Sequence, residues 1–334
     1  MIFMGDIIEI RNLVKKFGDF TALDSINLKI KEGQIYGILG PNGAGKTTTI
    51  SIVLGIEKPT RGQVLVDGMD NIKHKTEIKQ LIGFMTQETI VDSDLTAYEN
   101  LEIAGRLYHL KGKELEDAIK KALDEAELTD FANKKAGSFS GGMKRRLYLV
   151  KSMIQNPKVL ILDEPTTALD VHNRVQMWDR IRELNKRGMT IILTTQYLEE
   201  ADELCNEIAI IDHGKLIASG TASELKKSVS KGQVIEIIST RESADKIAKM
   251  LKAKFSLAPT VNEDRIEAFI DHDVFNTFSK VMNESIKEKL PIISISLRLP
   301  TMDDVFMKLT GSSLRDKTGE QSSDRSNIML QGRR

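Results

Sequence analysis

A glycine-rich segment that ends in Lys-Thr is the feature of this sequence that most directly predicts chemistry. Gly40–Thr47 reads G-P-N-G-A-G-K-T and matches the pattern G-x-x-x-x-G-K-[ST]. The glycines allow backbone N–H groups to converge on a phosphate, and the N-terminus of a following helix adds a positive dipole end. Lys46 is predicted to bridge the β- and γ-phosphates of a nucleotide, and Thr47 to offer its hydroxyl to Mg²⁺.

The surroundings of this segment favour a phosphate loop. The segment follows an apolar run at Ile35–Leu39, which is predicted to be a strand, and precedes a predicted helix that begins near Gly45. A glycine-rich turn that matches the pattern by chance is the alternative. The other residues predicted to contact the phosphates are Asn42, Gly43, Ala44, Gly45 and Thr48.

Two acidic residues end a second apolar run. Val159–Leu162 is followed directly by Asp163 and Glu164. Asp163 at the tip of a strand can hold Mg²⁺ through its water shell, and Glu164 can orient and deprotonate an attacking water molecule. Paired acids after a strand are usually a solvated loop, but together with a phosphate loop they predict a site of hydrolysis.

The elements that must position these residues follow an α/β pattern. From Ile7 to about Ser228, short β-branched runs alternate with helical stretches, which predicts a largely parallel sheet covered by helices. In such sheets ligands bind beyond the carboxyl ends of the strands. Between Thr96 and Ala136 the pattern changes to helices with charged faces. We therefore predict an inserted helical subdomain at about residues 96–155.

A second, smaller domain is predicted after Lys231-Gly232. Its expected elements are a strand at Gln233–Ser239, a helix at Ser243–Ala253, a strand at Arg265–Ile270, a helix at Asp273–Lys289 and a strand at Pro291–Leu297. This order resembles a ferredoxin-like α+β domain. The predicted domains are therefore residues 1–230 and 231–311, and residues 312–334 contain so few apolar side chains that a disordered tail is predicted.

Composition limits the classes of function. The chain has 334 residues, 40% of them hydrophobic, with 48 basic and 48 acidic side chains. This balance provides no global field that would attract nucleic acid or anionic lipid, so no nucleic-acid partner is expected. The single cysteine, Cys205, cannot form an intramolecular disulfide, which fits a reducing compartment.

The sequence also lacks the pattern of a membrane span. No apolar run approaches the roughly 18 residues that a spanning helix needs. The first residues have neither the basic region nor the apolar length of a signal peptide, and none is expected. If this protein acts at a membrane, another chain must supply the spanning helices.

A third motif identifies a family resemblance. Phe139–Arg146 reads F-S-G-G-M-K-R-R and resembles the signature of ABC ATPases, usually written LSGGQ, with Phe139 in place of the commoner Leu. Asp170, at the end of the loop that follows Glu164, also fits that family. The resemblance covers about residues 5–225. It implies a P-loop NTPase cassette with a RecA-like sheet core, ATP and Mg²⁺ as ligands, and ATPase activity.

The resemblance also implies a paired arrangement of cassettes. In the ABC family two cassettes pair head to tail, so Ser140, Gly141 and Gly142 are expected to contact the γ-phosphate of ATP held by a second cassette. Asp170 is also expected to bind the nucleotide. A homodimer is expected. Locally the same Ser-Gly-Gly turn is also a helix N-cap. The basic run Lys144–Arg146 is expected to be a solvated helix face rather than a phosphate clamp.

Two more positions match the family pattern. Phe17 falls where the family places an aromatic ring to stack on adenine, although a Phe in the core is the competing interpretation. Gln87 matches the family's Q-loop glutamine, which contacts Mg²⁺ beside the surface that receives the transporter's cytoplasmic helices.

Gln196 is the clearest departure, because most of the family has histidine there. Its amide can donate an N–H to the γ-phosphate, but it cannot become a cation or exchange a proton. The other histidines, His74, His109, His172, His213 and His272, do not replace it in sequence. Catalysis is therefore expected to depend more heavily on Glu164.

Three late segments narrow the resemblance to one subfamily. They are Thr195–Asp202, Ile211–Lys215 and Leu299–Phe306, which are similar to ATPases of the daunorubicin-resistance type. Those serve exporters of the ABC-2 class, which implies a separate polytopic permease and a cytoplasmic location at the inner face of the cell membrane. The main alternative is a soluble ABC ATPase that acts on ribosomes or DNA. A regulator that binds ATP with little hydrolysis is a third reading.

Overall fold

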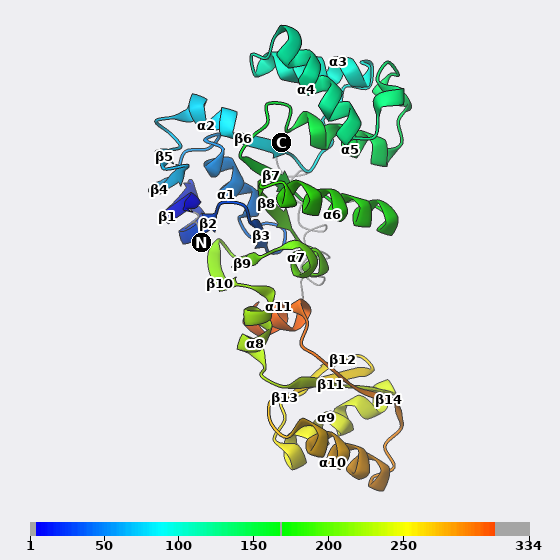
Figure 1. Ribbon diagram of the computed structural model, residues 1–334. Coiled ribbons are helices and arrows are strands. Elements are labelled where there is room, and N and C mark those ends of the chain that lie inside the picture. Colours follow the sequence, from blue (N-terminus) through cyan, green and yellow to red (C-terminus); the bar gives the residue numbers. More distant parts are fainter. Residues whose placement is uncertain (1–4, 168, 311–334) are drawn as a thin grey trace, which may run out of the picture. The chain divides into compact units, whose positions relative to one another are not determined.

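The computed structural model describes residues 5–167 and 169–310, and these form two compact units (Figure 1). The division falls after Ala222, whereas the sequence pattern predicts a boundary at residue 230. The difference is explained by α8 (Ala222–Val229), whose Leu225 and Val229 are buried and whose last carbonyl accepts a hydrogen bond from Lys308. We call residues 5–222 the cassette and residues 223–310 the accessory unit. The predicted tail at residues 312–334 lies outside the described residues.

A six-stranded sheet forms the centre of the cassette, with the order β10-β9-β3-β8-β7-β6. Neighbouring strands run parallel except β10, which is antiparallel to β9. The strands are β3 (Ile35–Leu39), β6 (Ile82–Met85), β7 (Val159–Asp163), β8 (Thr190–Thr195), β9 (Glu207–Asp212) and β10 (Lys215–Gly220). Every residue of β3, β7 and β8 is buried, as expected for parallel strands that are covered on both faces.

Side chains of β7 alternate between two hydrophobic layers. Val159 and Ile161 join a core shared with α1 and the antiparallel sheet β2-β1-β4-β5, whereas Leu160 and Leu162 face α6 and α7. These elements are β1 (Asp6–Phe17), β2 (Phe20–Lys31), α1 (Lys46–Val53), β4 (Arg61–Val66), β5 (Met69–Asp70), α2 (Lys75–Leu81), α6 (Val171–Lys186) and α7 (Leu198–Leu204). The predicted sheet covered by helices is confirmed.

Three helices between β6 and β7 form a separate group with its own hydrophobic core (Figure 1). They are α3 (Ala97–Leu107), α4 (Gly112–Glu125) and α5 (Gly141–Lys151), with short 3₁₀ turns at Thr129–Phe131 and Ala136–Ser138. A capping box starts α3: Glu99 N–H donates to Thr96 Oγ1 at 3.1 Å, and Thr96 N–H donates to Glu99 Oε2 at 2.7 Å. The start of the helical region is thus specified by local sequence.

The accessory unit contains a four-stranded antiparallel sheet with the order β12-β13-β11-β14. Its elements beyond α8 are β11 (Gln233–Ser239), α9 (Arg241–Phe255), β12 (Thr260–Asn262), β13 (Arg265–Ile270), α10 (Val274–Lys287), β14 (Ile292–Arg298) and α11 (Met302–Thr310). From β11 to β14 the element order is β-α-β-β-α-β, the order of ferredoxin-like units. β12 and α11 were not predicted from the sequence.

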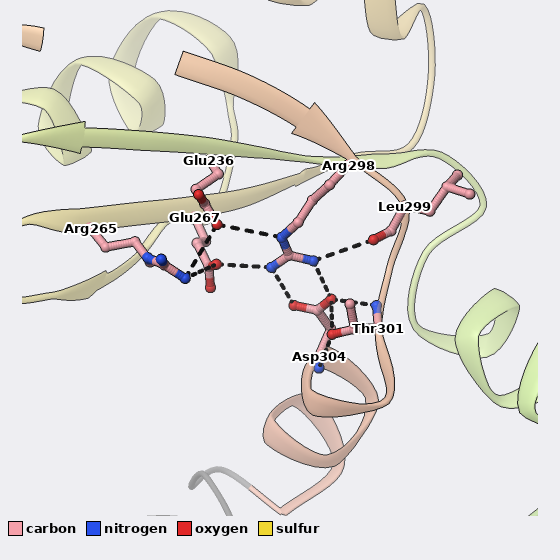
Figure 2. Close-up of polar contacts among 7 residues, drawn as sticks. All are labelled: Glu236, Arg265, Glu267, Arg298, Leu299, Thr301 and Asp304. Atoms are coloured by element: carbon pink, nitrogen blue, oxygen red, sulfur yellow. Dashed lines mark hydrogen bonds and ion pairs between the residues drawn. The ribbon is translucent and has the colours of Figure 1, made fainter. Parts of the chain in front are cut away.

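One arginine joins the end of β14 to the start of α11 (Figure 2). Arg298 donates to both carboxylate oxygens of Asp304, at 2.6 and 3.0 Å, and to Glu267 Oε1 at 2.8 Å. Asp304 also accepts hydrogen bonds from Thr301 N–H and Thr301 Oγ1. The carboxylate therefore forms a capping box with Thr301 at the start of α11 and anchors the helix to the sheet at the same time.

In the described residues, no helix combines the length and apolarity needed to cross a bilayer.

Candidate active site

Three neighbouring strands of the cassette end at the predicted site. The strands are neighbours in the order β3-β8-β7 (Figure 1). β3 leads into the glycine-rich segment, β8 leads to Gln196, and β7 ends at Asp163, which Glu164 follows. Backbone hydrogen bonds join these ends, because Gly40 N–H donates to Thr195 O at 3.4 Å and Glu164 N–H donates to Thr194 O at 3.1 Å. Segments far apart in sequence thus share the carboxyl edge of one sheet, where ligands bind in this architecture.

The glycine-rich segment has the backbone of a phosphate loop. Gly43 and Gly45 have φ values of 82° and 109°, in the left-handed region that favours glycine. A Cβ atom on Gly40 would lie 2.2 Å from the Ile211 carbonyl oxygen, and one on Gly45 would lie 2.6 Å from Leu23 Cδ2. The loop therefore packs too closely against β9 and β2 to admit larger residues at these points. Asn42 and Gly43 are exposed, whereas Ala44, Gly45 and Lys46 are buried.

Lys46 is buried among oxygen acceptors at the start of α1. Its Nζ donates to Gly40 O at 2.7 Å and Pro41 O at 3.2 Å, and lies 3.4 Å from Glu164 Oε1. Burial lowers the pKa of Lys46, against the opposing effect of the Glu164 and Asp163 carboxylates. The sequence predicted both Lys46 and Glu164, and the structure brings them into direct contact.

Glu164 is held in one orientation by its neighbours. Its backbone has φ 49°, an uncommon conformation for a non-glycine residue, and its N–H donates to Thr194. Carboxylate oxygen Oε1 faces Lys46, and Oε2 accepts a hydrogen bond from Thr167 Oγ1 at 3.1 Å. The carboxylate is thus held in place by Lys46 and Thr167, and its remaining lone pairs can accept a hydrogen bond from a water molecule.

Thr47 and Asp163 supply oxygen atoms that fit Mg²⁺. Thr47 Oγ1 lies 3.3 Å from Asp163 Oδ2, and Thr194 Oγ1 donates to Asp163 Oδ1. A hydroxyl and a carboxylate are the hard oxygen ligands that Mg²⁺ prefers. Gln87, the third predicted ligand, follows β6, and its side chain is exposed. Thr48 lies one residue further along α1 and is half-buried.

Gln196 lies beside this cluster and is half-buried. Its Oε1 atom is buried and has no hydrogen-bond partner among the described residues. Rotation about χ3 exchanges the amide oxygen with the N–H₂ group, so the same side chain can present a donor at this position. A buried amide oxygen without a partner at the carboxyl edge of the sheet fits a residue that contacts a ligand.

Phe17 does not belong to the hydrophobic core. Its side chain is 48% exposed at the end of β1, with Lys15 Nζ 4.6 Å from the ring centroid. The competing interpretation, a Phe in the core, is therefore wrong. An exposed ring is available to stack on a base.

The signature residues lie at the N-terminus of α5, in the helical region. Ser140 caps the helix by accepting a hydrogen bond from Met143 N–H at 3.2 Å, and both Ser140 and Gly141 are exposed, with Gly142 half-buried. Asp170 is exposed and caps α6, and its hydrogen bonds from Asn173 lower the pKa of its carboxyl. These residues thus present their polar groups outward.

The expectation of a solvated basic run after the signature is wrong for Arg145. Its side chain is only 4% exposed, and it donates hydrogen bonds to backbone carbonyls of Gln87, Glu164 and Pro165. The burial follows from the position of Arg145 on α5 between the buried residues of two hydrophobic clusters. Thr167 and Thr194, which contact Glu164 and Asp163, were also not predicted from the sequence. A threonine at the end of β8 was the available signal for Thr194.

The comparisons with known proteins agree with this geometry. A family model described as ABC transporter matches residues 23–167. The solved structure described as an ATP binding subunit of an ABC transporter is 26% identical, with a TM-score of 0.60 over 66% of this chain and 92% of that one. CbiO1 from Clostridium perfringens, part of the ABC transporter complex cbiONQ, is 25% identical, with a TM-score of 0.62 over 75% and 96% of the two chains. The predicted fold, a P-loop NTPase cassette, is confirmed.

Curated relatives match almost the whole length. Daunorubicin resistance ATP-binding protein DrrA3 of Streptomyces coeruleorubidus is 39% identical over 91% of this chain and 95% of its own. Nod factor export ATP-binding protein I of Burkholderia lata is 34% identical over 92% and 98% of the two chains. Linearmycin resistance ATP-binding protein LnrL of Bacillus subtilis is 33% identical over 93% and 100%. This chain belongs to the ABC transporter family of ATP-binding proteins, a family of ATPases.

Proposed function

We propose that this chain is the ATP-hydrolysing subunit of an ABC-2-type exporter. In this proposal two copies bind two MgATP at shared sites, and a separate membrane-spanning permease carries the cargo. The observation that carries the proposal is the contact of Lys46 with Glu164 beside the Thr47–Asp163 pair. Relatives named for daunorubicin resistance, Nod factor export and linearmycin resistance support the exporter class, because they match 95% or more of their own length.

The proposed chemistry is an in-line attack of water on the γ-phosphorus. Glu164 holds the water and takes its proton on a carboxylate oxygen, while the bond between the γ-phosphorus and the β–γ bridging oxygen breaks. Lys46 neutralises charge on the phosphate oxygens. Thr47 and Asp163 would hold Mg²⁺, with Gln87 as a further ligand, and the ion when bound neutralises charge on the β- and γ-phosphates. Gln196 donates its amide N–H to the γ-phosphate.

The exposed signature supports a shared site. Ser140 and Gly141 point their polar groups outward from α5, and Asp170 is exposed at the start of α6. A second copy placed head to tail would receive these groups at its own γ-phosphate, with Gly142 completing the turn. Phe17 is proposed to stack on adenine. The cassette would act at the inner face of the membrane, attached through its permease.

The transport assignment is tested by what the full chain binds in its native cells. We would solubilise membranes in mild detergent, recover the tagged chain and identify its partners by mass spectrometry. The proposal predicts a polytopic membrane protein. It also predicts that Ile90→Glu, which places a charge at a 56% exposed position near Gln87, reduces this recovery, whereas Ile217→Glu, at a 38% exposed position on β10, does not.

Recovery of ribosomes or DNA-bound proteins, with the chain absent from membranes, would leave the ATPase assignment intact and contradict the transport assignment. The relatives reported above give no support to that alternative.

A further inference from the structure

Helix α5, which begins at the signature residues and is called the signature helix below, contacts the loop after β6 through three polar side chains. Arg145, Tyr148 and Lys151 are spaced three residues apart on α5 and therefore face the same side. Arg145 donates to Gln87 O at 2.9 Å and to Thr89 Oγ1 at 3.2 Å. Tyr148 Oη accepts from Thr86 N–H at 3.1 Å, and Lys151 Nζ donates to Ile90 O at 3.1 Å. Hydrogen bonds at residues 86, 87, 89 and 90 thus hold the whole loop against the signature helix.

Arg145 differs from the other two residues because it also reaches the end of β7. Its Nε donates to Pro165 O at 2.9 Å, and its Nη2 donates to Glu164 O at 3.1 Å. One guanidinium therefore binds the backbone on both sides of the proposed active site, next to Gln87 and at Glu164 itself. The planar, forked donor set of arginine suits several acceptors at fixed angles, whereas the single ammonium of lysine does not.

The surroundings of Arg145 are unusual for a structural arginine. The side chain is 4% exposed and makes no ion pair within the part of the chain that the structure describes. Its guanidinium donates hydrogen bonds to three backbone carbonyl oxygens and one hydroxyl. A buried cation is costly to desolvate, and hydrogen bonds to three backbone carbonyls offset part of that cost. A role beyond stability is indicated by which backbone groups Arg145 binds, namely those of Gln87 and Glu164.

The turn after β7 is also held from its other side. Thr166 Oγ1 donates to Glu200 Oε1 at 2.8 Å, and Trp178 Nε1 donates to the same oxygen at 2.9 Å. Glu200 is fully buried on α7, the helix that follows Gln196. Arg145 and Glu200 thus hold consecutive residues of one turn, which fixes the backbone from which the Glu164 side chain extends.

We propose that Arg145 is a positioning residue for hydrolysis, which links the signature helix to the backbone of Gln87 and of Glu164. This inference rests on the proposed function. Ser140 and Gly141 at the start of the same helix are proposed to serve the ATP of the second copy. Within one copy, Arg145 therefore links the residues proposed to hydrolyse its own ATP to the signature residues proposed to contact the ATP of the second copy.

The test compares Arg145→Lys, Arg145→Met and a matched surface control in the purified full chain. The control is Arg182→Met, because Arg182 is also a helical arginine but pairs with Asp179 and Glu203 at the surface. The measurements are the melting curve, the Kd for MgADP by calorimetry, and kcat, KM and the Hill coefficient for MgATP. MgADP is the probe because it reports on the phosphate loop without the γ-phosphate.

We expect Arg145→Met to lower kcat by about 10²-fold, the effect of a displacement of about 1 Å at a reacting group. Its Kd for MgADP should stay within about threefold of wild type, and the Hill coefficient should fall towards one. Arg145→Lys should give an intermediate kcat, because an ammonium retains the charge and part of the donor set. Arg182→Met should match wild type in every readout.

The proposal is overturned if folded Arg145→Met keeps kcat within about twofold of wild type, or if kcat and MgADP affinity fall in parallel. If Arg145→Met does not fold, the lysine variant decides. A folded Arg145→Lys with wild-type kcat and Hill coefficient overturns the proposal, and a reduced kcat at unchanged MgADP affinity supports it. A wild-type chain that does not hydrolyse ATP would instead contradict the proposed function.

Discussion

At the scale of single residues, the site depends on charges that are buried together. The Lys46 and Glu164 side chains are 5% and 7% exposed and lie 3.4 Å apart. Removing either partner of such a pair leaves an unpaired buried charge, which typically costs about 3–5 kcal/mol. Gln196 is different, because it is neutral and its Oε1 atom has no partner among the described residues. Its substitution can therefore change catalysis with little change in stability.

We predict that Gln196→Ala lowers kcat by about 10- to 100-fold, the equivalent of one hydrogen bond to a charged group at about 1.5–3 kcal/mol. Gln196→His should retain at least the wild-type rate, because an imidazole N–H can replace the amide donor. Steady-state ATPase assays check both variants, with melting curves to establish folding. An alanine variant as active as wild type would show that Gln196 makes no contact in the transition state.

At the scale of elements, the positions that could be predicted from sequence are those specified locally. The phosphate loop, the acids after β7 and the N-cap at Ser140 each depend on residues within one short segment. The burial of Arg145 could not be predicted, because its acceptors lie at residues 87–89 and 164–165 and an arginine within a basic run carries no sign of burial. β12 was missed because its three residues are all exposed and show no apolar alternation.

The backbone conformation of the phosphate loop depends on Gly45, which has φ 109°. Gly45→Ala should lower the free energy of unfolding of the cassette by about 1–3 kcal/mol and abolish detectable MgATP binding, because alanine is strained at φ 109° and its Cβ would meet Leu23 Cδ2 at 2.6 Å. Gly5→Ala is the control, since a Cβ there has nothing within 4 Å. Urea unfolding and calorimetric titration check both variants. Unchanged MgATP affinity in Gly45→Ala would contradict the proposed role of the loop.

At the scale of the whole molecule, each of the two compact units has a hydrophobic core of its own. The accessory unit relies on Arg298, which is 27% exposed at its side chain and binds Asp304 and Glu267 (Figure 2). Unfolding of the accessory unit should therefore respond to this network independently of the cassette.

We predict that Arg298→Ala lowers the free energy of unfolding of the accessory unit by about 2 kcal/mol, because hydrogen bonds to a charged partner are lost. The Arg241–Glu263 pair is largely exposed, so Arg241→Ala should lower the free energy of unfolding of the accessory unit much less than Arg298→Ala does. MgATP binding by the cassette should be unchanged in both. Equal destabilisation by the two substitutions would contradict the anchoring role of Arg298.

The same network predicts a dependence on pH. Burial raises the pKa of Asp304, but hydrogen bonds from Arg298 and Thr301 outweigh this, and the net pKa lies below the ordinary value. The stabilisation is therefore complete above the pKa of this aspartate in the unfolded chain, which is about 4. It is lost as the pH falls through the lower pKa of Asp304 in the folded unit. Acid titration of unfolding should show this loss in wild type and a flatter profile in Asp304→Asn. A profile unchanged by that substitution would contradict the assignment.

Glu164 is proposed to catalyse hydrolysis at a site shared by two copies, and a Glu164→Gln variant separates hydrolysis from ATP-dependent pairing. Purified Glu164→Gln would be compared with wild type in MgATP, by steady-state turnover and by light scattering for molar mass, with Glu183→Gln on the surface of α6 as control. We predict that Glu164→Gln lowers turnover by about 10²- to 10⁴-fold and accumulates as a dimer only when MgATP is present. A folded Glu164→Gln with wild-type turnover, or one that stays monomeric in saturating MgATP, would contradict this proposal.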